Sequence, residues 1–156
     1  MLHLAIPGRP PLALANLVLD YNGTLAVDGQ PIPGVMERLR RLSEALHIHV
    51  LTADTFGTAT AHCAGTLLML HVIPTEDQAS AKLRYVERLG TDACIAIGNG
   101  RNDHLMLEAA ALGIAVTQTE GASPTSLAAA DVVFGSILDA LDALLAPKRL
   151  VATLRT

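Results

Sequence analysis

The sequence predicts an α/β protein with a doubly wound parallel sheet, Rossmann-like, in three α/β/α layers. Short apolar runs of strand length alternate with helical patterns, as is typical of parallel sheets covered on both faces. Hydrophobic residues make up 51% of the 156 residues but aromatic ones only 3%, so Ala, Leu, Ile and Val must build the core. No repeat or linker interrupts this pattern, and we expect a single domain over residues 1–156.

The chain up to the first buried carboxylate is expected to be extended. Residues 1–16 indicate a strand or hairpin, because the turn-forming letters PGRPP separate two apolar segments. The run LVLD then reads as a buried strand that ends at Asp20. The following LAVDGQPIP is expected to be a small hairpin resembling a flap.

Helices and strands alternate over the rest of the chain. The helix within 78–89 should carry Leu83, Val86 and Leu89 on one face. The expected elements, in order, are helix 33–46, strand 47–54, helix 56–65, strand 66–73, helix 78–89, strand 93–100, helix 104–112, strand 113–117, a helix from 123, strand 131–134, helix 136–145 and a basic C-terminal helix within 146–156.

Composition excludes several classes of protein. The formal charge is −4 and the basic residues are mostly scattered, so no nucleic-acid partner is indicated. No apolar run reaches the roughly 18 residues of a membrane helix, and the first residues do not resemble a secretory leader. The cysteines, Cys63 and Cys94, indicate a reduced interior without disulfides. We therefore expect a soluble cytoplasmic protein.

Polar residues follow three of the predicted strands. Asp20, Thr52 and the loop GNGRND come directly after apolar runs, and the carboxyl ends of parallel strands meet at one sheet edge. An aspartate nucleophile that attacks phosphorus needs a cation, backbone N–H groups, a hydroxyl and a positive side chain nearby. The sequence offers Asp20 as nucleophile, the turn to Thr24 as an anion-binding nest, Thr52 as hydroxyl, Lys82 as positive charge and Asp103 as second carboxylate for a divalent cation.

These residues resemble the motifs of the haloacid dehalogenase superfamily, in particular its soluble proteins related to P-type ATPases. LDYNGTL is similar to the first motif, LTADT to the second, Lys82 to the lysine of the third, and IGNGRNDHLMLEAAALGIAV to the fourth. The resemblance implies a Mg²⁺-dependent phosphohydrolase that works through an aspartyl-phosphate on Asp20. The implied site residues are catalytic Asp20, Asn22, Thr52 and Lys82; phosphate-binding Gly23, Thr24, Thr52, Ala53 and Lys82; metal-binding Asp20, Asn22 through its carbonyl, Asn99 and Asp103; and supporting Asp54 and Asn102.

Two positions depart from the pattern of this family. Asn22 stands where its hydrolases usually have the aspartate that protonates the leaving group, and an amide has no proton to give near neutral pH. Asn99 stands where a metal-binding aspartate is usual, which weakens the expected cation site. Slow turnover is the first hypothesis. The alternative is a catalytically weakened phosphate-site protein that acts as a binding or regulatory partner.

The short spans between the motifs leave no room for a cap domain or for a nucleotide-binding domain. Capless members of the superfamily commonly act on macromolecules or close their sites with a neighbouring subunit. The resemblance therefore implies a phosphorylated substrate, small or macromolecular, and a homo-oligomer, and it does not imply ATP hydrolysis.

Several other side chains leave more than one interpretation open. Asp54 either supports Thr52 or Lys82, or caps the helix expected from Phe56. Arg101 either reaches a substrate phosphate or is solvated. The histidines and Cys63 at 47–71 match no closed set of zinc ligands, and His104 is expected at an exposed helix start. Gly98 and Gly100 do not complete a dinucleotide-binding loop, because position 103 is an aspartate.

Overall fold

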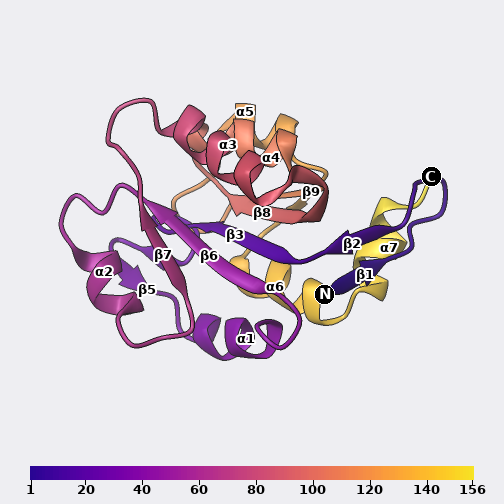
Figure 1. The fold of residues 1–156 in the computed structure, drawn as a ribbon, viewed down its shortest axis with the longest axis horizontal. Coiled ribbons are helices and arrows are strands. Elements are labelled where there is room, and N and C mark those ends of the chain that lie inside the picture. The colour runs from indigo at the N-terminus through magenta and orange to yellow at the C-terminus, as the bar shows by residue number, and fades with distance from the viewer.

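A computed structural model describes residues 1–156. Its centre is a six-stranded parallel sheet in the order β10-β9-β8-β3-β6-β7, which confirms the predicted fold class. The chain enters the middle of the sheet at β3, extends to one edge through β6 and β7, and returns to the other side of β3 through β8 (Figure 1). The strands are β3 (Asn16–Asp20), β6 (His47–Thr52), β7 (Met69–Val72), β8 (Cys94–Gly98), β9 (Leu112–Val116) and β10 (Val132–Phe134).

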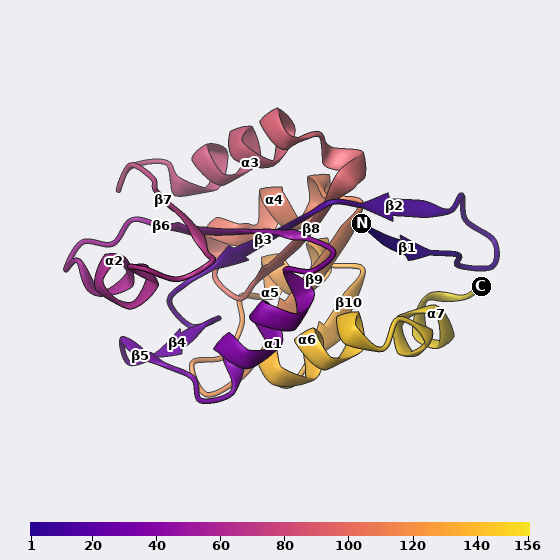
Figure 2. The ribbon, with the colours of Figure 1, turned by 60° about the horizontal axis from the view of Figure 1, so that its bottom comes forward.

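Helices cover both faces of the sheet, as Figure 2 shows. One face carries α1, α6 and α7 over a core of 28 buried residues, and the other carries α3, α4 and α5 over a core of 10. Both layers follow from the near-continuous apolar strands, since a strand buried on both faces needs a cover on each side. The helices are α1 (Val35–Leu42), α2 (Thr58–Cys63), α3 (Gln78–Leu89), α4 (His104–Ala109), α5 (Pro124–Ala129), α6 (Ile137–Leu145) and α7 (Lys148–Leu154), with 3₁₀ turns η1 (Thr91–Ala93) and η2 (Arg101–Asp103).

Two hairpins lie outside the main sheet. β1 (Leu2–Leu4) pairs with β2 (Leu12–Leu14), and their apolar residues join the same core as α7. The C-terminus lies at the turn of this hairpin, where the Thr156 hydroxyl donates to the Pro7 carbonyl at 3.4 Å (Figure 1). β4 (Ala26–Val27) pairs with β5 (Gln30–Pro31) directly after β3. None of the helices has the length and apolar character needed to cross a lipid bilayer.

Several elements are shorter than the sequence pattern indicates, among them α4, which ends at Ala109. Helix α1 ends at Leu42, where the Ser43 hydroxyl donates a hydrogen bond to the Arg40 carbonyl and so competes with a further helical turn. Helix α2 begins at Thr58 because Gly57, at φ 70°, cannot continue a right-handed helix. The strand expected over 66–73 pairs with β6 only through Met69–Val72.

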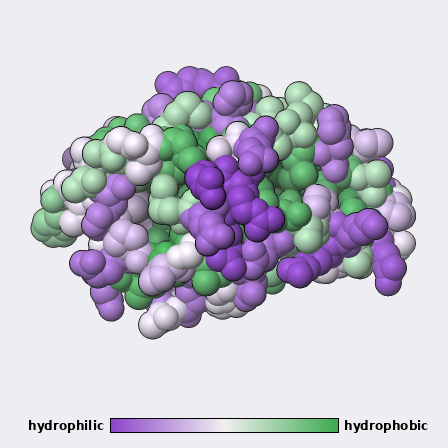
Figure 3. All heavy atoms as spheres, turned by 90° about the horizontal axis from the view of Figure 1, so that it is seen from below, coloured by the Kyte–Doolittle hydropathy of each residue, from purple (hydrophilic) through white to green (hydrophobic).

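Helix α3 has the predicted bounds but a different buried face. Its buried residues include Lys82, Tyr85 and Val86, whereas Leu83 and Leu89 are only half-buried. The expected apolar stripe is therefore rotated so that a lysine points inward. On the opposite side of the molecule, Figure 3 shows hydrophilic side chains gathered over α1, where Arg38 forms an ion pair with Asp142 of α6 at 2.8 Å.

Candidate active site

Three strands deliver polar residues to one edge of the sheet. Asp20 is the last residue of β3, Thr52 is the last residue of β6, and Asn99 directly follows β8. Because β3 lies between β6 and β8 and all three run in parallel, these residues lie side by side. β3 is also the strand at which the chain order reverses, and open α/β sheets bind ligands beyond the carboxyl ends of the strands at this position.

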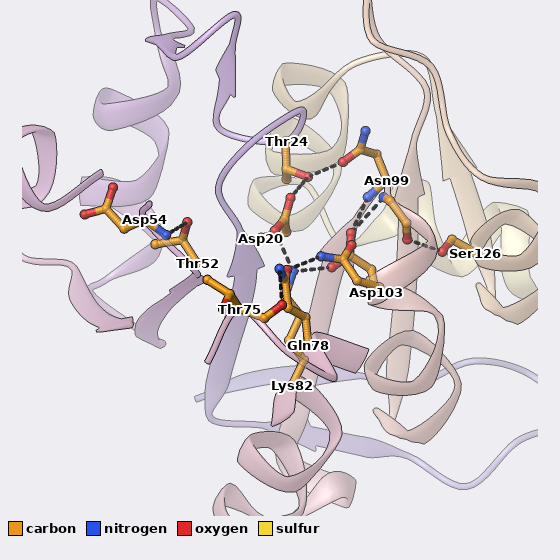
Figure 4. Close-up of polar contacts among 12 residues, drawn as sticks. Asp20, Thr24, Thr52, Asp54, Thr75, Gln78, Lys82, Asn99, Asp103 and Ser126 are labelled. Atoms are coloured by element: carbon orange, nitrogen blue, oxygen red, sulfur yellow. Dashed lines mark hydrogen bonds and ion pairs between the residues drawn. The ribbon is translucent and has the colours of Figure 1, made fainter. Parts of the chain in front are cut away.

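A buried lysine joins the first and last of the predicted motifs (Figure 4). The Lys82 Nζ donates to Oδ1 of Asp20 and to Oδ1 of Asp103, both at 2.6 Å. Lys82 is only 1% exposed, and Asp103 has no exposed surface. Burial by itself lowers the pKa of Lys82, but the two carboxylates outweigh this effect and raise the pKa above its usual value. The lysine therefore stays charged, and one net negative charge remains on the three side chains when both carboxyls are ionised.

The pKa of Asp20 is raised to about 6. Burial is the largest cause, the Asp103 carboxylate adds to it, and Lys82 partly offsets both. Asp20 is nevertheless 6% exposed and lines a cavity, so an incoming ligand can reach it. A carboxylate that is accessible, poorly solvated and oriented by an ammonium group is a suitable nucleophile.

Asp103 holds the loop after β8 in place. Its Oδ2 accepts hydrogen bonds from the backbone N–H groups of Asn99 at 2.9 Å and Gly100 at 2.8 Å, while Oδ1 accepts from Lys82. These contacts are those of a residue that positions Lys82 and this loop. Direct binding of a cation by Asp103 stays a prediction, and it requires these contacts to rearrange.

Two other oxygens converge in a way that fits a divalent cation. The Thr24 hydroxyl lies 3.3 Å from Oδ2 of Asp20 and 3.3 Å from Oδ1 of Asn99, but its single hydrogen can bond to only one of them at a time. The Asn99 amide donates from Nδ2 to the Gly121 carbonyl at 2.9 Å, which leaves its oxygen facing the Thr24 hydroxyl. A carboxylate and an amide oxygen are ligands of the kind that Mg²⁺ prefers. The donor set therefore fits a magnesium ion.

Gly23 lies in the turn between the end of β3 at Asp20 and the start of β4 at Ala26. Its φ is 79°, and a Cβ at this position would lie 2.5 Å from the Asn99 Nδ2. Glycine is therefore required both by the backbone conformation and by the close approach of Asn99.

A cavity of about 690 Å³ opens above these groups. The side chain of Asn22 is exposed, and Thr52 and Ala53 at the end of β6 form another part of the wall. The lining residues are Asp20, Asn22, Asp28, Gly29, Thr52, Ala53, Asp54, Thr55, Phe56, Thr58, Gln78, Asn99, Gly100, Asn102 and Glu120.

Asp54 and Asn102 form hydrogen bonds with residues other than Asp20, Lys82 and Asp103. The Asp54 carboxylate accepts hydrogen bonds from the backbone N–H groups of Ala59 at 2.8 Å and Thr60 at 2.9 Å, and therefore caps the start of α2. Its own backbone N–H donates to the Thr52 hydroxyl at 3.1 Å. Asn102 donates from Nδ2 to the Gln78 side chain at 2.7 Å. Of the two interpretations of Asp54, the contacts favour helix capping.

Sequence reasoning missed two polar residues that support the site. Gln118 donates from Nε2 to the carbonyls of Gly23 at 2.7 Å and Thr24 at 3.0 Å, and its Oε1 accepts from the Ile137 N–H at 2.8 Å. Ser126 donates to the Gly100 carbonyl at 2.5 Å. Both follow β9 and belong to no motif, so only the packing of the chain reveals that they brace the turn after β3 and the loop after β8.

Three of the histidines lie against tyrosine side chains. His49 contacts the Tyr85 hydroxyl at 2.9 Å and the Asn16 side chain at 3.2 Å. The rings of His71 and Tyr85 lie 4.5 Å apart between their centroids and are tilted by 49°, and Nε2 of His71 is buried without a hydrogen-bond partner. His62 bonds to the hydroxyl of Tyr21 at 2.6 Å. No group of three or more His, Cys, Asp or Glu side chains has the arrangement of a metal site.

Comparison with known proteins agrees with this fold. Residues 78–140 match the model of the haloacid dehalogenase-like hydrolase family, a segment that includes Lys82, Asn99 and Asp103. An uncharacterized protein of Methanocaldococcus jannaschii is 47% identical over 79 residues, which cover 48% of this chain and 85% of the relative.

Solved structures show the same architecture. The 3-deoxy-D-manno-octulosonate 8-phosphate phosphatase from Moraxella catarrhalis, crystallised with magnesium and phosphate, matches with a TM-score of 0.68 and 18% identity over 91% of this chain and 94% of its own. The catalytic domain of a CPx-ATPase matches with a TM-score of 0.56 and 21% identity over 81% of this chain and 46% of its own. The fold places an aspartate at the end of its central strand. Residues 78–140 belong to the haloacid dehalogenase-like hydrolase family, and the chain as a whole has the fold of these solved structures.

Proposed function

We propose that the protein is a magnesium-dependent phosphohydrolase that works through an aspartyl-phosphate on Asp20, and that its turnover is slow. The observation that carries the proposal is the buried Lys82, which bonds to both Asp20 and Asp103 at the carboxyl edge of the sheet. A purely structural ion pair would not need to sit at the base of an open cavity. A phosphoryl group bound above Asp20 would instead find a nucleophile and a positive charge in contact with each other.

In the first step an Asp20 oxygen attacks phosphorus, and the bond from phosphorus to the leaving-group oxygen breaks. Lys82 orients the carboxylate and offsets the charge that develops on the phosphoryl oxygens. The Thr52 hydroxyl contributes a further hydrogen bond. The N–H groups of Gly23 and Thr24, which the sequence assigned to an anion-binding nest, instead donate within the turn to the carbonyls of Ala26 at 2.7 Å and Tyr21 at 3.2 Å. In the second step water attacks phosphorus, releases phosphate and restores the Asp20 carboxylate.

A magnesium ion bound at this edge would neutralise phosphoryl charge and align the phosphoryl group with Asp20. The ligands in this proposal are the Asp20 carboxylate, the Asn22 backbone carbonyl and the Asn99 side-chain oxygen, which is already oriented by its bond to Gly121. Asp103 holds Lys82 and the Asn99 loop around them. An amide in place of a carboxylate at Asn99 lowers the negative charge of the ligand set, so we expect weak cation binding.

Asn22 explains the expected slow turnover. Its exposed side chain lines the cavity next to Asp20, where a general acid would have to be, but an amide cannot give or take a proton near neutral pH. The leaving group must then take its proton from water. General acid–base catalysis contributes roughly 10²–10⁴-fold, so esters with good leaving groups should be turned over fastest.

The test is phosphate release from acetyl phosphate and p-nitrophenyl phosphate with Mg²⁺, combined with acid-quenched labelling of the protein. We expect wild type to form a labelled phosphoenzyme, Asp20→Asn to form none, and Asn22→Asp to raise kcat by about 10²-fold or more. Asn22 and Asn99 also favour a second candidate, a binding protein that recognises a phosphorylated partner without hydrolysing it. Folded variants without label or phosphate release would refute the hydrolase and support this second function.

A further inference from the structure

The wall of the active-site cavity has an unusual chemical composition for a site that binds phosphorylated molecules. Besides the carboxylates of Asp20, Asp28, Asp54 and Glu120, it presents amides and hydroxyl groups, among them Gln78, Asn102, Thr55 and Thr58. None of the lining residues is a lysine, an arginine or a histidine. The positive charge at this site is that of Lys82, which lies below the cavity and is already bonded to two carboxylates.

Two exposed carboxylates stand at the mouth of this cavity. Asp28 lies in the turn between β4 and β5, and Glu120 lies in the loop after β9. The backbone N–H of Asp28 donates to Oε1 of Glu120 at 3.0 Å, which ties the hairpin to that loop and keeps both acids at the rim. Neither carboxylate forms an ion pair, so both contribute their charge to the cavity.

This composition determines which leaving groups can be accommodated. A second anionic group on the substrate would meet the two rim carboxylates and would find no cation in the wall to offset them. Hydroxyl groups, in contrast, can bond to the amides and threonines. The volume of about 690 Å³ is of the size that binds small molecules.

We propose that the site takes phosphomonoesters of neutral, hydroxyl-rich molecules such as sugars and polyols, and that Asp28 and Glu120 exclude leaving groups that carry a carboxylate or a second phosphate. This inference rests on the proposed function and specifies its substrate class. It concerns the rim residues alone, so it can fail while the chemistry at Asp20 holds.

The experiment compares two esters that differ at one carbon. Sorbitol 6-phosphate and 6-phosphogluconate share their chain and phosphate, and they differ by a hydroxymethyl group in place of a carboxylate. We expect kcat/KM to favour sorbitol 6-phosphate by at least about 10-fold at low salt, and the preference to shrink at 0.5 M NaCl. The dissociation constants of both esters for Asp20→Asn, measured by calorimetry, should show the same order.

Rim variants then locate the cause of the preference. Asp28→Asn with Glu120→Gln keeps the hydrogen-bonding atoms and removes both charges, and it should reduce the preference about 3–10-fold. The control is Glu44→Gln with Asp92→Asn, which also removes two negative charges, at exposed positions near the amino ends of β6 and β8. It should leave the preference unchanged.

The outcomes separate the two proposals. Equal kcat/KM and equal Kd for the two esters would overturn the inference, even if both are hydrolysed. A preference that survives in the rim variant, or that the control variant changes as much, would also overturn it. Preference in Kd without phosphate release from any ester, acetyl phosphate included, would support the inference and refute the hydrolase.

Discussion

Replacing Lys82 with methionine tests the central ion-pair network. The substitution preserves most of the side-chain volume but removes the ammonium that bonds to Asp20 and Asp103 at 2.6 Å. The carboxylates of Asp20, 6% exposed, and Asp103, fully buried, are then left near each other without a cation between them. Breaking a buried ion pair by removing one partner costs about 3–5 kcal/mol.

The cost translates into a measurable change in melting temperature. For a chain of this length, 1 kcal/mol corresponds to about 2–4 °C in Tm, so we expect Lys82→Met to melt about 6–20 °C below wild type. Calorimetry or thermal unfolding followed by circular dichroism at pH 7.5 measures this difference. The control is Lys148→Met, because Lys148 is exposed at the start of α7 and should lose less than about 1 kcal/mol.

The loss of Tm in Lys82→Met should also depend on pH, and it should be smaller at lower pH. Lys82 lowers the pKa of Asp20, so its removal lets this pKa rise further above the value of about 6. A carboxyl whose folded pKa is raised stabilises the fold below its unfolded pKa and loses this contribution as pH rises through the folded value. The difference between Lys82→Met and wild type should therefore shrink as pH falls from 7.5 to 5. A Tm within 2 °C of wild type at pH 7.5 would refute the reasoning.

Two further predictions concern residues outside the motifs. Gln118→Ala should lower kcat by about 10-fold and the free energy of unfolding by about 1–3 kcal/mol, because it frees the carbonyls of the turn at Gly23 and leaves the Ile137 N–H without its partner. Steady-state kinetics measures the first effect and urea unfolding the second, with Thr119→Ala at the exposed neighbouring position as control. An unchanged kcat would contradict the positioning role of Gln118. Burial lowers the pKa of His49 to about 4, whereas its pKa in the unfolded chain is about 6.5. The free energy of unfolding should therefore fall by about 1–3 kcal/mol as pH falls from 6.5 toward 4. His49→Gln should flatten the pH dependence of the unfolding free energy, measured with urea, whereas His3→Gln at an exposed position should not. The same pH dependence in both variants would show that His49 is not the group responsible.

The fold was predictable because strand and helix patterns are local. The apolar runs around Val18, Ile95 and Ile114 mark three central strands without any knowledge of their neighbours. Bounds were less predictable where a single side chain or glycine ends an element, as Ser43 and Gly57 do. These endings depend on a backbone conformation or on one hydrogen bond, and hydrophobic patterning carries neither.

The inward face of α3 shows a limit of the hydrophobic pattern. Periodicity counts Lys82 as a surface residue, yet the structure buries it, because two carboxylates from distant parts of the chain offset the cost of desolvation. The motifs indicated that Lys82 belongs near a phosphate. They gave no indication that it bonds to Asp20 and Asp103 at the same time.

By itself, the sequence determined the class of fold, the order of the motifs and the chemical types at Asp20, Asn22 and Lys82, because each depends on a residue and its neighbours along the chain. Only the tertiary structure decided which oxygens of Asp103 and Asn99 accept hydrogen bonds. It alone shows that Gln118 bonds to the turn at Gly23 and Thr24, and that Asp28 and Glu120 meet at the mouth of the cavity. These contacts join residues as far as 95 positions apart, and their distances are set by how the sheet and its two helical layers pack.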